Sequence, residues 1–270
     1  MRLLSYAKAD GTLHLGEWRN EALYTLPHAS VLEVLSGKVN RDEQYKMKSS
    51  YTLSVPYVPP RIFAIGRNYA EHAAELGSQA PSKPLIFAKF PSCVIGTGQA
   101  IEWTPRITQQ VDWEGELAVI IGKGGRDIPE EQAYEHIYGY TIANDVSARD
   151  LQDGDGQWTR AKGLDTFCPL GPHLVSTDEI PDPHALRIVT TVNGEVMQDG
   201  HTGAMIFKIP FLVAYLSQSF TLRPGDLILT GTPSGVGKAR KPPRFLADGD
   251  VVSVTIEGLG TLSNPCRVRP

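Results

Sequence analysis

Cysteine is scarce in this chain of 270 residues: Cys93, Cys168 and Cys266 lie far apart in the sequence. An odd number of isolated cysteines excludes a disulfide-rich scaffold, and none has the close neighbour that a thiolate metal site needs. The seven histidines are also scattered, with no pair at the spacing typical of zinc ligands. We therefore expect reduced thiols, no structural zinc and a cytoplasmic location.

Long apolar runs and a large charge of one sign are also missing. The longest mostly apolar stretch, residues 209–222, is interrupted by Pro210, Ser217, Gln218 and Ser219, and it falls short of the ~20 residues that span a bilayer. The N-terminal residues lack the apolar core and cleavage site of a signal peptide. With 26 basic and 30 acidic residues, the net charge is −4. We therefore expect neither a nucleic-acid nor a membrane partner.

The first part of the sequence has a different pattern from the rest. Three short strands are predicted, with Asp10-Gly11 and Arg19-Asn20 as turns, followed by a short helix that ends at Gly37. The prolines between residues 55 and 60 favour an extended connector. We expect a small strand-rich N-terminal domain over residues 1–56 and a catalytic domain over residues 57–270.

Strand and helix patterns mix in the second part, without a repeating strand–helix–strand order. Asn193-Gly194 is the strongest hairpin signal, and apolar residues between 210 and 220 predict a buried helix. These patterns indicate an α+β fold rich in β-structure. The predicted strands cover residues 61–65, 85–89, 111–121, 137–145, 187–196 (as a hairpin), 226–230 and 251–257, and the predicted helices cover residues 68–76, 129–136 and 210–220.

Two glutamates lie within the predicted strand at residues 111–121. Because side chains alternate faces along a strand, Glu114 and Glu116 would point to the same side with Cα atoms ~7 Å apart. Two carboxylates on so apolar a strand repel each other and are costly to desolvate, and a divalent cation removes both penalties. The alternative is a solvated polar face on a half-exposed strand.

A third carboxylate, Asp145, comes at the end of another apolar strand and could complete the same site. Three carboxylates with open water positions suit a hard ion such as Mg²⁺ or Mn²⁺, whereas Ca²⁺ usually takes more ligands. On the predicted helix at residues 68–76, His72 and Glu75 are three residues apart and can touch. A glutamate that orients a histidine makes a general base, although the same spacing is more often a surface pair.

Seven segments follow one another along the chain: GRNYAEHAAELG, FAKFPSCVIG, DWEGELAVIIG, YTIANDVSARDLQ, AKGLDTFCPLGP, TVNGEVMQDG and LTGTPSGVG. In this order they resemble the fumarylacetoacetate hydrolase family, in particular its bacterial acylpyruvases and 2-hydroxyhepta-2,4-diene-1,7-dioate isomerases. The resemblance covers about residues 62–270 and implies a rolled mixed β-sheet, a small-molecule 2-oxo acid substrate and, as is common among members, a homodimer.

The resemblance also implies roles for particular residues. Glu114, Glu116 and Asp145 match the family's Mg²⁺ ligands, and His72 and Glu75 match its water-activating dyad on a lid segment. The catalytic lysine corresponds to Lys162. The positions expected to contact substrate are Arg67, Tyr69, Lys89, Arg149, Gln152, Thr230 and Thr232.

Some of these positions have simpler interpretations. Arg149 could pair only with Asp150 or another exposed acid, Lys89 could be a solvated edge lysine, and Thr230 and Thr232 could cap a strand end. The basic residues between 238 and 244 are expected in a solvated loop, with binding of a distal substrate carboxylate as the alternative. His201 departs from the asparagine that many members have, which leaves the substrate open.

The expected reaction is hydrolysis of a C–C bond in a 2,4-dioxo acid such as an acylpyruvate, giving pyruvate and a carboxylic acid. His72 with Glu75 would activate water, and the ion with Lys162 would stabilise the pyruvate enolate that leaves. The same site could instead decarboxylate oxaloacetate, or isomerise 5-carboxymethyl-2-hydroxymuconate or 2-hydroxyhepta-2,4-dienedioate. We favour hydrolysis because both members of the dyad are present.

Overall fold

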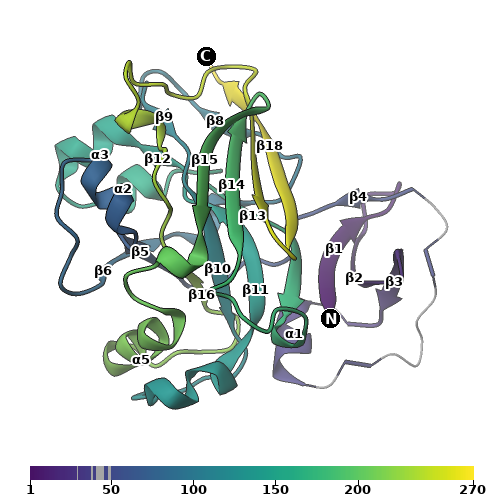
Figure 1. Cartoon of the computed structure of the whole chain (residues 1–270). Helices are drawn as coiled ribbons and strands as arrows, with labels where there is room; N and C mark the ends of the chain where they lie inside the picture. Colours follow the sequence, from purple (N-terminus) through teal and green to yellow (C-terminus); the bar gives the residue numbers. More distant parts are fainter. Residues whose placement is uncertain (29, 38, 41–45, 48–49) are drawn as a thin grey trace.

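The computed structural model describes residues 1–28, 30–37, 39–40, 46–47 and 50–270. Its centre is a large twisted mixed sheet, which runs through the middle of the molecule in Figure 1. Neighbouring strands of the sheet are antiparallel except two pairs, β16 with β5 and β13 with β7, which are parallel. In spatial order the strands are β3 (Ala22–Leu26), β2 (Leu13–Arg19), β1 (Arg2–Ala7), β13 (Cys168–Ser176), β11 (Ile137–Asn144), β10 (Gly115–Ile121), β16 (Leu227–Leu229), β5 (Ile62–Gly66) and β6 (Leu85–Lys89), with β4 (Thr52–Leu53) beside β1 and β7 (Val94–Ile95) beside β13.

A second sheet packs on one face of the first and carries the predicted hairpin. Asn193 and Gly194 both have positive φ, at 53° and 83°, as a two-residue turn between β14 and β15 requires. Alternate residues of β10 share a core with one group of apolar residues of this sheet: Ile188, Val254, Ile256 and Leu262. The strands of the second sheet are, in order, β15 (Glu195–His201), β14 (Arg187–Val192), β17 (Val251–Ile256), β18 (Gly260–Val268) and β8 (Ile101–Trp103).

The central strand β10 is buried on both of its faces. Leu117 and Val119 point into the core shared with the second sheet, whereas Ala118 and Ile120 point into the core shared with the N-terminal strands. A strand covered on both faces needs a continuous apolar sequence rather than an alternating one. This explains the run Leu-Ala-Val-Ile-Ile that follows the two glutamates.

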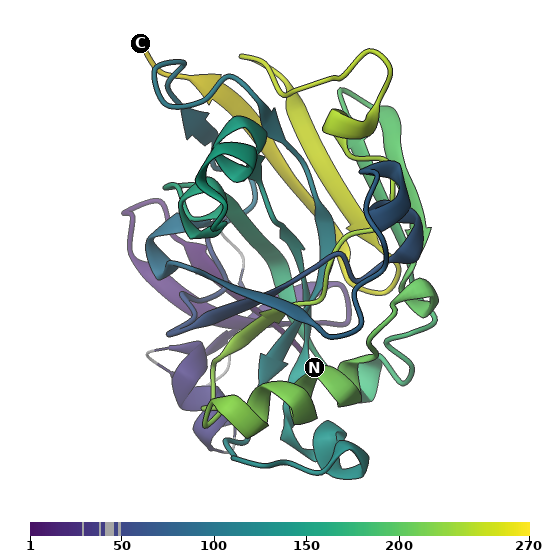
Figure 2. The ribbon, with the colours of Figure 1, turned by 90° about the vertical axis from the view of Figure 1, so that its left-hand side faces the viewer.

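The helices are short and lie at the edges of the sheets (Figures 1 and 2). The longest, α5, crosses below the large sheet in both views, beside the 3-10 helix at Glu130–His136. Within the described residues, no helix is long and apolar enough to cross a membrane. The α-helices are α1 (Val31–Ser36), α2 (Ala70–Glu75), α3 (Arg149–Asp155), α4 (Thr159–Lys162) and α5 (Ile209–Ser219); further 3-10 helices cover Pro91–Cys93, Thr177–Glu179, Thr202–Ala204 and Gly237–Ala239.

The N-terminal strands extend the large sheet. Strand β1 pairs with β13, with Arg2 opposite Val175 and Leu3 opposite Leu174. Leu3 also shares a core with Leu174 and with Ile62 of β5. Strands from both sides of residue 56 are thus joined by hydrogen bonds in one sheet. The domain boundary at this position stays a prediction.

Most predicted elements are confirmed, but one strand is wrong in its length. Residues 111–121 form two strands, β9 (Val111–Asp112) and β10, and only β10 pairs with β11. Strand β9 pairs instead with β12 (Ser147–Ala148). Trp113, which is fully buried, lies at the break and donates its indole N–H to the carbonyl of Gly235 at 3.2 Å.

The predicted helix at residues 129–136 is a 3-10 helix. Sequence analysis missed α3, α4, β18 and β13. The last of these contains Pro169, Gly171 and Pro172, residues that ordinarily argue against a strand in the middle of a sheet.

Candidate active site

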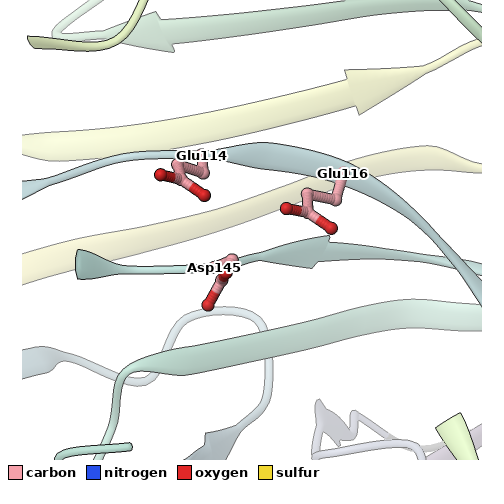
Figure 3. A group of neighbouring side chains, drawn as sticks. All are labelled: Glu114, Glu116 and Asp145. Carbon is pink, nitrogen blue, oxygen red and sulfur yellow. The ribbon is translucent and has the colours of Figure 1, made fainter. Parts of the chain in front are cut away.

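Three carboxylates meet at the end of β10. Glu114, Glu116 and Asp145 each offer an oxygen within 4.8 Å of the others, and their residues are at most 5% exposed. In Figure 3 the two glutamate side chains leave the same segment on the same side and face the segment that carries Asp145. The predicted acidic cluster is therefore present, and the alternative of a solvated polar face is wrong.

Glu114 and Asp145 lie opposite each other at the break between β9 and β10. Paired strands end at Gly115 opposite Asn144 and resume at Asp112 opposite Ser147. Between these points, the N–H of Glu114 donates to the Asn144 side-chain oxygen at 2.9 Å. The N–H of Asp145 donates to the Glu114 carbonyl at 2.8 Å. The second bond is one that a regular antiparallel ladder makes in this register, whereas the first replaces a backbone partner of Glu114 with a side chain. Together they fix the backbone of both positions.

Gly115 separates the two glutamates because no side chain fits there. An added Cβ would lie 2.3 Å from Thr190 Oγ1 and 2.9 Å from Val254 Cγ1, both on the second sheet. The peptide groups of Gly115 are also in use: its N–H donates to Gln198 Oε1 at 3.0 Å, and its carbonyl accepts from Thr232 Oγ1 at 2.9 Å. The close approach of the second sheet thus holds the glutamates from behind.

Basic side chains compensate two of the three carboxylates. Lys162 Nζ lies 2.6 Å from Glu114 Oε2 and 2.8 Å from Asp145 Oδ2. Arg149 Nη1 lies 2.7 Å from Glu114 Oε1, and Lys89 Nζ lies 2.5 Å from Asp145 Oδ1. Burial disfavours the charge of Glu114, but Lys162 and Arg149 outweigh it and hold its pKa well below the usual range.

Glu116 differs from its neighbours because, among the described residues, no basic side chain contacts it. One of its oxygens accepts the N–H of Gly231 at 2.8 Å. Burial and the charges of Asp145 and Glu114 raise its pKa well above the usual range. The three buried carboxylates, one of which lacks a basic partner, together form a donor set that fits a hard divalent cation such as Mg²⁺.

His72 and Glu75 form the predicted dyad on α2. His72 Nδ1 lies 2.7 Å from Glu75 Oε1, and the other oxygen of Glu75 accepts the N–H of Gly235 at 2.8 Å. His72 is only 4% exposed, so the alternative of a surface pair is wrong. Glu75 therefore fixes the imidazole ring and leaves Nε2 for other contacts.

A single cavity of about 290 Å³ joins His72 to the carboxylates. Such a volume lies near the lower limit for ligand sites and suits a small substrate. Of the residues predicted from the sequence, the cavity is lined by Arg67, His72, Glu114, Glu116, Asp145, Arg149, Gln152, Lys162 and Thr232.

Four predicted residues lie outside this lining. Glu75 lies behind His72, and Thr230 Oγ1 donates to the carbonyl of Leu117 at 2.8 Å. Lys89 is 3% exposed and lies beneath Asp145, so it is not a solvated edge lysine. Burial opposes its charge, but Asp145 outweighs burial and raises its pKa. Tyr69 borders a separate depression of about 540 Å³, which also includes His201.

Sequence analysis missed Asp112, which is fully buried behind the site. Its Oδ2 accepts Arg149 Nε at 2.8 Å and the N–H of Lys238 at 3.0 Å, and its Oδ1 accepts the N–H of Gly237 at 2.7 Å. Arg149 thus pairs with two buried acids rather than with Asp150. The only sequence signal was an acidic residue at the start of an apolar run.

The basic loop near residue 240 contributes one residue to the cavity. Lys238 lines it and forms an ion pair with Asp153, Nζ to Oδ2, at 2.5 Å. Arg240 and Arg244 pair instead with Glu195 at 3.5 Å and Asp250 at 2.7 Å.

Comparison with known proteins gives relatives over most of the chain. Oxaloacetate tautomerase YisK of Bacillus subtilis is 50% identical over 212 residues, which cover 78% of this chain and 70% of that protein. Human oxaloacetate tautomerase FAHD2A, mitochondrial, is 48% identical over 220 residues, covering 80% of this chain and 70% of that protein.

Solved structures resemble the whole chain. A fumarylacetoacetate hydrolase from Exiguobacterium antarcticum has 40% identity and a TM-score of 0.91, with both chains covered completely. A 5-carboxymethyl-2-hydroxymuconate delta-isomerase from Mycobacterium smegmatis also has 40% identity, a TM-score of 0.84 and complete coverage of both chains. Residues 61–267 match the family model described as fumarylacetoacetate (FAA) hydrolase C-terminal. The chain is therefore an enzyme of the fumarylacetoacetate hydrolase family.

Proposed function

We propose that the protein is a metal-dependent isomerase that interconverts the keto and enol forms of a small 2-oxo acid, with oxaloacetate as the first substrate to test. The observation that carries the proposal is the position of His72 in one small cavity with the three carboxylates. The names of the relatives support this reaction: tautomerases at 50% and 48% identity and an isomerase at 40%. They favour isomerisation over the hydrolysis that we expected from the sequence.

The carboxylates Glu114, Glu116 and Asp145 would hold the cation, which we propose to be Mg²⁺ or Mn²⁺. When bound, such an ion supplies positive charge for the oxyanion that develops at C2 of a 2-oxo acid. Lys162 adds a second positive charge at the same place, because its Nζ contacts both Glu114 and Asp145. Arg149 also offers a donor, since its buried Nη2 has no hydrogen-bond partner among the described residues.

His72 would move the proton. Its Nδ1 faces Glu75, so Nε2 is the atom that can take a proton from C3 of the keto form and pass it to the C2 oxygen to give the enol, and the reverse order returns the keto form. Glu75 is a positioning residue, held in turn by the N–H of Gly235. Tautomerisation needs no water molecule, whereas hydrolysis would need His72 to activate one.

The test follows the ultraviolet absorbance of enol-oxaloacetate with Mg²⁺ and then with EDTA, alongside pyruvate release from oxaloacetate and from acetylpyruvate. We expect the enol absorbance to disappear with Mg²⁺ present and to persist with EDTA. His72→Gln should slow its disappearance by roughly 100- to 10,000-fold. Pyruvate release from acetylpyruvate would support the hydrolase that we expected from the sequence, and pyruvate release from oxaloacetate would indicate a decarboxylase. Normal enol turnover in His72→Gln would reject the proposed base.

The assembly and the location stay proposals. We propose a homodimer, because members of the family commonly form one, and a cytoplasmic location, because the cysteines are few and unpaired. Light scattering of the purified protein tests the first of these directly.

A further inference from the structure

The cavity contains one cationic side chain without an acidic partner among the described residues. Lys162 contacts Glu114 and Asp145, Arg149 contacts Asp112 and Glu114, and Lys238 contacts Asp153. Arg67 has no ion-pair partner in the described part of the chain, and its Cζ lies over the ring of Trp158, 5.6 Å from the ring centroid. Its buried Nε has no hydrogen-bond partner in the described part of the chain. A guanidinium that lines a cavity with an unused donor is prepared for an anionic ligand.

The backbone around Arg67 is held firmly in place. Arg67 has a φ of 56°, in the left-handed region that residues other than glycine seldom adopt. The next side chain, Asn68, is fully buried and forms three hydrogen bonds: it donates to the carbonyls of Thr230 at 2.8 Å and Phe207 at 3.0 Å and accepts the N–H of Phe207 at 2.7 Å. These bonds hold the backbone of Arg67 in its strained conformation. Strain of this kind is typical of residues in functional sites.

The guanidinium of Arg67 lies over the indole ring of Trp158, and this ring is itself held in place. The ring packs edge-on against Phe87 at a centroid distance of 5.5 Å, and it lies so close to Gly66 that an added Cβ would be 2.5 Å from the ring. A cation stacked on a fixed indole keeps its N–H groups free for a ligand in the plane of the guanidinium. Gly66 and Trp158 thus preorganise Arg67 without using its donors.

The charges of the site indicate which group Arg67 binds. With a cation held by the acidic cluster, a 2-oxo acid would use its first carboxylate and its 2-oxo oxygen there, beside Lys162 and Arg149. Arg67 belongs to a different wall of the cavity, the segment between β5 and α2. From this we infer that Arg67 is a specificity-determining residue that binds the distal carboxylate of a 2-oxo dicarboxylate substrate. The inference rests on the proposed function and names its substrate class.

The experiment compares two stable ligands in the presence of Mg²⁺, by calorimetry. Oxalate mimics only the 2-oxo acid end, whereas N-oxalylglycine adds a distal carboxylate. We expect Arg67→Gln to weaken N-oxalylglycine roughly 10- to 100-fold, the range for a lost charged hydrogen bond, and to leave oxalate unchanged. Arg67→Lys should retain part of the affinity. Arg160→Gln, which removes an equal charge from an exposed pair with Asp155, is the matched control.

Two results would show that Arg67 does not bind the distal carboxylate, and a third separates this role from the proposed reaction. If Arg67→Gln leaves both affinities unchanged, or lowers both equally, Arg67 does not bind the distal group and the inference is wrong. Equal weakening of N-oxalylglycine by Arg160→Gln would reduce the effect to long-range charge and would also overturn it. If the wild-type protein fails to turn over enol-oxaloacetate but the selective loss is observed, the proposed reaction fails while the dicarboxylate site stands.

Discussion

The backbone N–H of Asp145 donates to the carbonyl of Glu114 at 2.8 Å, at the point where the pairing of two strands is interrupted. The register is the same on both sides of this point, so Glu114 and Asp145 lie opposite each other and their side chains share one face of the strand pair. Glu116 joins them on that face, two residues further along β10. The acidic cluster therefore follows from side-chain alternation together with antiparallel pairing.

Glu116→Gln should remove most of the affinity for divalent cations. Glu116 is the carboxylate without a basic partner in the described structure, so its charge is the one that a cation must satisfy. Because the loss of even an outer partner of a metal ligand costs roughly 10- to 100-fold, we expect an effect of ~100-fold or more in Mg²⁺ titration calorimetry. Glu71→Gln is the control, since Glu71 is an exposed acid on α2 that contacts Ser234. Unchanged Mg²⁺ affinity in Glu116→Gln would mean that the cluster holds no cation.

Gly115→Ala should destabilise the protein and weaken the cation site together. The new methyl group would overlap Thr190 Oγ1 and crowd Val254, and overpacking of this kind costs roughly 1 to 3 kcal/mol. Urea unfolding with and without Mg²⁺ measures both effects. The double variant Gly115→Ala, Thr190→Ala should recover part of the loss, because the closest clashing atom is then gone. Absence of any recovery would place the cause elsewhere than at the contact between the sheets.

Asp112→Asn should destabilise the fold and disturb the cavity wall. The carboxylate accepts bonds from Arg149, Gly237 and Lys238, and an amide group would present N–H to some of these donors. Breaking a buried ion pair in this way costs about 3 to 5 kcal/mol. Asp155→Asn removes an exposed ion pair with Arg160 and should change the urea midpoint little. A midpoint for Asp112→Asn as high as that of Asp155→Asn would contradict the role of Asp112.

The acidic cluster and the dyad could be predicted because their patterns are local. Glu114 and Glu116 alternate along the chain, and His72 and Glu75 share one helix face. The partners that hold them are distant in sequence: Lys162 follows Glu114 by 48 residues, and Gly231 follows Glu116 by 115. No periodicity links such positions, so the network around the cluster depends on the fold itself or on the family resemblance.

The same limit applies to the fold. The Asn193-Gly194 hairpin and the apolar run of β10 follow from turn chemistry and from burial on two faces. Strand β13 was missed because its prolines hide it, and the end of β9 was missed because the sequence continues to look like a strand. The break there interrupts the pairing without shifting its register, because the Asn144 side chain takes the N–H of Glu114. Alternation along one segment does not encode such a contact.

His173 should make the stability of the protein depend on pH. It lies on β13 near the pairing with β1, and its buried Nδ1 has no hydrogen-bond partner among the described residues. Burial, together with the charge of Arg2, lowers its pKa to about 4. In the unfolded chain its pKa returns to about 6.5, so the unfolded chain binds the proton first as the pH falls. Stability from this residue is therefore complete above about pH 6.5 and is lost between about pH 6.5 and pH 4.

His173→Gln removes the titrating imidazole, so the free energy of unfolding should change less between about pH 6.5 and pH 4. Urea unfolding at about pH 7.5 and about pH 5, with EDTA present, should show a loss on acidification that is roughly 2 kcal/mol smaller in the variant than in the wild type. The comparison between two pH values cancels any constant effect of the substitution on packing. His201→Gln, at an exposed histidine on β15, should leave the wild-type pH dependence unchanged. If His173→Gln loses as much stability as the wild type between the two pH values, His173 carries a proton in the folded state and its environment is more polar than its burial against β1 implies.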